Sequence, residues 1–162
     1  MPPPRGKGVT THCFEDADLA GNTVTRNSQK GILIFYNRAP IIWNSKRKNT
    51  VEASTYSSEI FAMNNAVELI DALRYKIRIF GFPIDGPTNI FCDNESVTKN
   101  CSYLTSIIKK KHHLIDYNRN REAVAAGTCH ITKEDTDMKL SDLFTELLSQ
   151  IRREDLLNKF TY

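Results

Sequence analysis

The chain has 162 residues, which suits one domain with a substantial core and is too short for two. Hydrophobic residues make up 40% and charged residues 25%, as in a typical globular domain, and the formal net charge of +3 does not by itself require a nucleic-acid partner. No apolar run is long enough to cross a bilayer, and no signal peptide is recognisable, so we expect neither membrane insertion nor secretion.

The four cysteines, Cys13, Cys92, Cys101 and Cys129, are scattered along the chain and form no C-x-x-C pair. This spacing argues against a zinc site and against a disulfide framework. We therefore expect reduced thiols and an intracellular location, either cytoplasmic or nuclear.

The first 11 residues are rich in proline and glycine and carry basic side chains, a composition that predicts a disordered leader over residues 1–11. Three β-type runs follow at residues 12–17, 31–36 and 40–44. The connection that begins at Asn37 is short, so we expect the second and third strands to form an antiparallel hairpin.

From Tyr56 onwards, apolar residues recur at a spacing of three and four, which predicts a long helix. Ser54 or Thr55 can cap its N-terminus, and Gly81-Phe82-Pro83 ends it. The apolar stripe that should face the core consists of Ile60, Met63, Val67, Ile70, Leu73 and Ile77.

The second half of the sequence alternates short strands with helices. Strands are predicted at residues 88–92 and 129–132. Helices are predicted to start at Asp93 or Asn94, to cover 111–126 before Gly127, and to cover 140–148 with Ser141 as the cap. Residues 150–162 should form a helical tail, which leaves 12–149 for the domain itself.

The element order β-β-β-α-β-α-α-β-α predicts an α/β fold, with a five-stranded mixed sheet flanked by helices. The first three strands should be antiparallel, because they are joined by short connections. The later two strands should be parallel additions to the same sheet.

Four acidic residues lie at the ends of different predicted elements: Asp16, Glu59, Asp93 and Asp142. Taken singly, each has an ordinary explanation. Asp93 and Asp142 suit helix N-termini, where the helix dipole favours negative charge. Asp16 suits a turn and Glu59 suits an exposed helix position.

Taken together, the same four residues indicate a metal site. The carboxyl ends of neighbouring parallel strands meet at one edge of a sheet, where α/β folds place ligands. Clustered carboxylates repel one another unless a cation compensates them. Oxygen ligands without histidine or thiolate suit Mg²⁺ or Mn²⁺. Two such ions about 4 Å apart can activate a water and stabilise the leaving oxygen of a phosphodiester.

Six short segments, in this order, resemble elements of the ribonuclease H domain of copia-type (Ty1/copia) retrotransposons. They are FEDADLAG at 14–21, IWNSKR at 42–47, SEIFA at 58–62, FCDNES at 91–96, Lys111-His112 with Tyr117, and LSDLFT at 140–145. The resemblance extends from about His12 to Leu148, nearly the whole predicted domain. Leu19, Asn118 and Glu146 depart from the family pattern, which usually has Trp, His and Lys at these positions.

This resemblance implies a ribonuclease H-like fold and hydrolysis of the RNA strand of RNA–DNA hybrids by a two-metal mechanism. It assigns Asp16, Glu59, Asp93 and Asp142 as catalytic, metal-binding residues for two Mg²⁺ or Mn²⁺ ions. In the family this domain follows the reverse transcriptase within the Pol polyprotein, which would be its partner in cis.

Basic and polar residues near the predicted site are candidates for binding the hybrid. The candidates are Asn22, Asn44, Ser45, Lys46, Arg47, Lys48, Asn94, Lys111 and His112. The alternative for the basic ones is a solvated turn and a solvated helix face. Trp43 and Tyr117 are predicted to be core residues.

Two other functions remain open. One is an integrase-like or resolvase-like nuclease on the same fold. The order Asp, Glu, Asp, Asp, with Glu on the first long helix, argues against the Asp, Asp, Glu order of an integrase. The other is a catalytically decayed domain that only binds nucleic acid or packs against a polymerase domain, which the sequence does not exclude.

Overall fold

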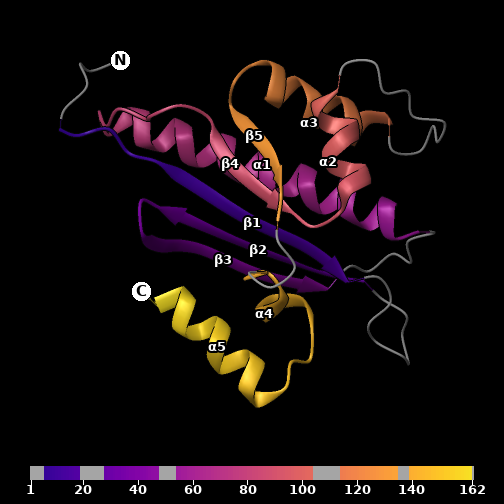
Figure 1. The fold of residues 1–162 in the computed structure, drawn as a ribbon. Helices are drawn as coiled ribbons and strands as arrows, with labels where there is room; N and C mark the ends of the chain where they lie inside the picture. The colour runs from indigo at the N-terminus through magenta and orange to yellow at the C-terminus, as the bar shows by residue number, and fades with distance from the viewer. Residues whose placement is uncertain (1–5, 19–27, 48–53, 104–113, 135–138, 162) are drawn as a thin grey trace.

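A computed structural model describes residues 6–18, 28–47, 54–103, 114–134 and 139–161. Within these ranges the strands form one five-stranded sheet in the order β3-β2-β1-β4-β5 (Figure 1). The strands are β1 (Thr11–Asp18), β2 (Gln29–Tyr36), β3 (Ala39–Arg47), β4 (Thr88–Cys92) and β5 (Cys129–Lys133). The first three are antiparallel, and β4 and β5 are added in parallel beside β1, which confirms the predicted mixed sheet.

Helices lie on both sides of this sheet (Figure 1). On one side are α1 (Thr55–Ile79), α2 (Glu95–Ser102) and α3 (Leu114–Ala125), and on the other are α4 (Asp142–Thr145) and α5 (Gln150–Thr161). None of the described helices is long and apolar enough to cross a lipid bilayer.

The long helix α1 begins and packs as its sequence predicts. Ser54 is its N-cap, and the Ser54 side chain accepts a hydrogen bond from the Ser57 backbone N–H. Five residues of the predicted stripe are buried: Ile60, Met63, Val67, Ile70 and Ile77. Most of them join the main core, which β1, β2, β4 and β5 complete from the sheet.

Residues of β2 alternate between the two faces of the sheet. Ile32 and Ile34 face α1 and belong to the main core, whereas Leu33 and Phe35 belong to a smaller cluster with Leu140 and Leu156. Period-two alternation of this kind is the basis of a sheet that is covered on both sides. The site described below lies where the two faces meet.

Three predictions about the ends and edges of the fold are wrong. The predicted leader is too long, because Val9 is buried and forms a β-bridge with Ile84. The helix predicted over 140–148 is a single turn, and Ser141 makes no side-chain capping bond. Trp43 is 62% exposed, since it lies on edge strand β3, whereas Tyr117 is buried as predicted.

Candidate metal centre

Three of the four predicted acids converge at the carboxyl end of the sheet. Asp16 lies on β1, Asp93 directly follows β4, and Glu59 lies near the N-terminus of α1. One carboxylate oxygen of each residue lies within 4.8 Å of the others. Because β1 and β4 are adjacent and parallel, their ends must meet, and α1 begins at the same edge.

The fourth acid, Asp142, is linked to Asp16 and Asp93 by a shared ion-pair partner, Lys139. The Nζ atom of Lys139 lies 2.8 Å from Asp16 Oδ1, 2.9 Å from Asp93 Oδ2 and 3.1 Å from Asp142 Oδ1. Lys139 is only 7% exposed. Burial lowers the pKa of Lys139, but the Asp16 and Asp93 carboxylates outweigh it, so the pKa lies above its usual range and the ammonium stays charged.

Helix α4 can approach the sheet closely because residue 31 is glycine. Gly31 pairs with Asp16 in the β1–β2 register. A Cβ atom at Gly31 would lie 2.8 Å from the Phe144 Cβ and 3.0 Å from the Ser141 carbonyl oxygen. This approach lets Thr145 Oγ1 donate a 2.5 Å hydrogen bond to Asp16 Oδ2, so α4 holds the second oxygen of the same carboxylate.

Glu134, which follows β5, contacts both the end of β4 and the residue after Lys139. Its backbone N–H donates to the Cys92 carbonyl at 2.9 Å, and its Oε1 accepts from the Leu140 N–H at 3.3 Å. Glu134 is buried, and this burial raises the pKa of Glu134 to about 8. The segment that carries Lys139 and Asp142 is therefore tied to the end of β4.

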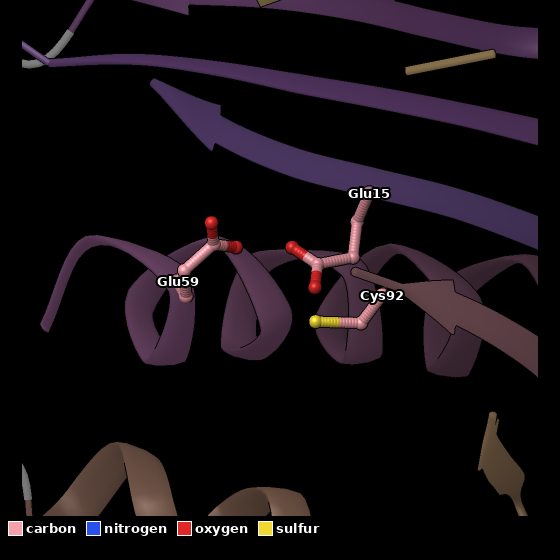
Figure 2. A group of neighbouring side chains, drawn as sticks. All are labelled: Glu15, Glu59 and Cys92. Carbon is pink, nitrogen blue, oxygen red and sulfur yellow. The ribbon is translucent and has the colours of Figure 1, made fainter. Parts of the chain in front are cut away.

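A further acid, Glu15, lies next to the cluster on the side of the sheet that α1 covers. Figure 2 shows Glu15 from β1 facing Glu59 from α1, with the Cys92 thiol beside Glu15. Burial raises the pKa of Glu15 to about 8. The adjacent Cys92 thiol lowers this pKa, and the nearby Asp16 carboxylate raises it. Burial, reinforced by Glu15 and Asp16, raises the pKa of Glu59 to about 10. The neutral acids are thus favoured deep in this part of the site.

The donor set fits a hard divalent cation. Its ligand atoms are carboxylate oxygens, which Mg²⁺ and Mn²⁺ prefer. Glu59 Oε2 is buried and has no hydrogen-bond partner among the described residues, so it is available to a cation. The Lys139 ammonium supplies the compensating positive charge in the described structure.

No family model matches the chain. The sequence is 26% identical over 155 residues to the retrovirus-related Pol polyprotein from transposon RE2 of Arabidopsis thaliana. The aligned region is 96% of this chain and 11% of that polyprotein. It is also 26% identical over 144 residues to the Pol polyprotein from transposon TNT 1-94 of Nicotiana tabacum, covering 87% of this chain and 10% of that polyprotein. The resemblance to retrotransposon Pol polyproteins is confirmed, and the chain spans about a tenth of their length.

Solved structures identify the fold. The RNase H1 of Halobacterium salinarum NRC-1 matches with a TM-score of 0.60 at 15% identity, covering 90% of this chain and 98% of that one. The chain has a ribonuclease H fold. LC11-RNase H1, solved in complex with an RNA/DNA hybrid, matches with a TM-score of 0.64 at 11% identity, covering 84% and 94%.

On this ribonuclease H fold, the described basic candidates lie at the same end of the sheet as the acids. Ser45 is in register with Gly31, which pairs with Asp16. Two strand spacings place Ser45 roughly 10 Å from Asp16. Lys46 and Arg47 follow Ser45 and are exposed. Four further candidates lie outside the described residues: Asn22, Lys48, Lys111 and His112.

Three polar candidates have structural contacts of their own. The Ser45 hydroxyl donates to the Phe144 carbonyl at 2.7 Å, which ties β3 to α4. The Asn94 side-chain oxygen accepts from the backbone N–H groups of Ser96 and Val97 and caps α2. Asn44 is half-buried in β3. Because Asn94 provides the cap, the Asp93 carboxylate remains available to the cluster.

Sequence analysis did not single out Lys139, Glu15 or Glu134. A local signal for Lys139 exists, because it precedes Asp142 by three residues, a spacing at which side chains meet on a helical turn. Glu15 precedes Asp16 on β1, where successive side chains point to opposite faces of the sheet. Its proximity to Glu59 arises because α1 crosses beneath the end of β1.

Proposed function

We propose that this chain hydrolyses the RNA strand of RNA–DNA hybrids with Mg²⁺ or Mn²⁺, leaving a 3′-hydroxyl and a 5′-phosphate. The observation that carries the proposal is the convergence of Asp16, Glu59 and Asp93 within 4.8 Å on a ribonuclease H fold. We further propose that it acts as the ribonuclease H part of a retrotransposon Pol polyprotein, with a reverse transcriptase in cis. The similarity to the RE2 polyprotein supports this context.

Asp16, Glu59, Asp93 and Asp142 would hold the divalent ions, which supply an activated water and stabilise the leaving oxygen when bound. Thr145 orients the Asp16 carboxylate through its hydrogen bond. Orientation by a neighbouring donor keeps a ligand in a productive geometry. Gly31 permits this contact, because any larger residue would push α4 away from β2.

The hybrid would approach along the exposed end of β3. Lys46 and Arg47 would contact phosphates, a sequence-independent interaction that weakens with salt. The cut strand must present 2′-hydroxyl groups to the site, because this group distinguishes RNA from DNA. This arrangement predicts a preference for hybrids that does not depend on base sequence.

Side-by-side digestion of a hybrid, an RNA duplex and a DNA duplex of one sequence tests the proposal. With Mg²⁺ or Mn²⁺ we expect cleavage of the RNA strand of the hybrid and little cleavage of either other duplex. Asp16→Asn should abolish the cleavage, which excludes a contaminating nuclease. Equal cutting of the DNA duplex would refute the assignment.

A second candidate function is nucleic-acid binding without cleavage, and the position of Lys139 favours it. Its ammonium lies at contact distance from three of the carboxylates that would hold the ions. In the same digestion experiment, this function predicts retention of the hybrid in a binding assay and no cleavage with either metal. Such a result would replace the ribonuclease proposal.

A further inference from the structure

Lys139 is positioned as an internal cation of the carboxylate cluster. Its Nζ contacts Asp16, Asp93 and Asp142 at 2.8, 2.9 and 3.1 Å. These acids come from β1, from the residue after β4, and from α4. An ammonium group has three donor hydrogens, so three acceptors satisfy it fully. With 7% exposure, this is a buried ionic centre and differs from a solvated surface ion pair.

Lys139 contacts one oxygen of each of three acids that would hold a divalent cation. Asp16 illustrates the conflict, because its Oδ1 contacts Lys139 and its Oδ2 accepts from Thr145. A metal ion approaches carboxylate oxygens to about 2.0–2.6 Å. An ammonium about 3 Å from the same oxygens would then lie beside the ion, where the two positive charges repel each other.

We propose that Lys139 competes with the divalent cation for the carboxylate cluster and must withdraw before the metal binds. This inference rests on the proposed metal-dependent function and adds to it the residue that sets the metal requirement. Lys139 compensates the clustered acids in the metal-free protein, so the domain folds without metal. The same contacts lower the affinity for Mg²⁺ and Mn²⁺.

Lys139→Met tests the competition, because methionine keeps much of the side-chain volume and removes the charge. Mn²⁺ binding by titration calorimetry should tighten by about tenfold or more in this variant, since a charge at this distance is removed. Lys133→Met is the matched control, because Lys133 also pairs with an acid, Glu95 at 3.8 Å, but is 59% exposed. The control should bind Mn²⁺ as the parent protein does. Equal affinity of Lys139→Met and parent would refute the inference.

The unaltered protein provides a second test that does not depend on the folding of the variant. Reductive methylation followed by mass spectrometry measures how readily each amine reacts. We expect Lys139 to react slowly in EDTA and faster in saturating Mn²⁺, because the metal displaces its ammonium from the carboxylates. Lys133 should react equally in both. Unchanged protection of Lys139 in the metal-bound protein would show that lysine and metal coexist, which overturns the proposal.

The failure of this inference can be told apart from the failure of the proposed function. Tight Mn²⁺ binding by Lys139→Met without cleavage of hybrids by either protein would support the competition and refute the ribonuclease. If both proteins cleave hybrids with the same dependence on metal concentration, the ribonuclease is supported and the competition is refuted. Cleavage by Lys139→Met at lower metal than the parent requires would support both.

Discussion

The two faces of the sheet differ in how they are built and in what they contribute. The face toward α1, α2 and α3 holds the main core, whereas the buried residues described in the other cluster are Leu33, Phe35, Leu140 and Leu156. We call the side of α1, α2 and α3 the larger face and the side of α4 and α5 the smaller face. The smaller face nevertheless supplies Lys139, Thr145 and Asp142 to the site. The face toward α1 therefore holds most of the buried apolar residues described, while the opposite face supplies several residues of the site.

The site needs both faces because its ligands come from both. Glu59 belongs to α1 on the larger face and Asp142 to α4 on the smaller one. Asp16 and Asp93, at the ends of adjacent strands, lie between them. A change on the larger face should therefore alter folding first, and a change on the smaller face should alter the site first.

The largest expected effect is on activity at the junction of the faces. Asp93→Asn should lower hybrid cleavage on the order of a thousandfold, because a neutral amide would hold a divalent cation far less strongly than a charged carboxylate does. The fold should remain intact, because Asn94 caps α2. Loss of the Asp93–Lys139 ion pair offsets the relief of repulsion among the acids, so the change in stability should be small. Single-turnover cleavage and denaturant unfolding measure the two quantities. Asp85→Asn, an exposed acid, is the control, and parental cleavage by Asp93→Asn would contradict the metal role.

The next effect separates the stabilities of the two faces. Ile70→Ala and Leu156→Ala each truncate a side chain that is 0% exposed. Ile70→Ala should lower the free energy of unfolding by about 3 kcal/mol, because it opens a cavity in the main core. Leu156→Ala should mainly release α5 by local opening. Hydrogen exchange should then quicken in α5 and remain slow in the sheet, and uniform quickening would contradict the comparison.

A smaller effect is expected where α4 meets the sheet. Gly31→Ala introduces a Cβ atom 2.8 Å from the Phe144 Cβ and 2.9 Å from Thr145 Cγ2. Overpacking of this kind costs about 1–3 kcal/mol of stability. Cleavage should fall as well, because Thr145 and Asp142 move away from Asp16. Unfolding and cleavage assays measure both, and unchanged values for both would show that α4 tolerates a wider separation.

A separate effect concerns pH and one buried acid, Glu134. Burial raises the pKa of Glu134 to about 8, above the ordinary value of 4.5 that applies in the unfolded chain. The folded state therefore holds a proton that the unfolded state releases between these values, and this contribution to stability is lost as pH rises through about 8. Glu134→Gln should reduce that loss, by at most about 1.4 kcal/mol per pH unit. Denaturant unfolding from pH 5 to 9 without metal measures it, and parallel profiles would contradict the assignment.

Local pattern predicted the larger face better than the smaller one. The stripe on α1 and the antiparallel hairpin of β2 and β3 follow from hydrophobic periodicity and a short connection, which a single segment contains. The exposure of Trp43 cannot be predicted from local pattern, because it depends on how far α4 and α5 extend across β3. The helix predicted over 140–148 stops after Thr145, where the backbone of Glu146 becomes extended. The length of α4 depends on its packing against β2, which the periodicity of residues 140–148 does not reveal.

Pattern in the sequence predicts four acids at the ends of different elements and brings the two strand-borne acids, Asp16 and Asp93, to one edge of the sheet. The entry of Lys139 into the cluster and the approach of Glu15 to Glu59 are seen only in the folded structure. The physical reason is the kind of interaction that places each residue. Acids at strand ends are placed by backbone pairing, which pattern reveals, whereas an ammonium within 3.1 Å of three carboxylates is placed by packing between remote segments.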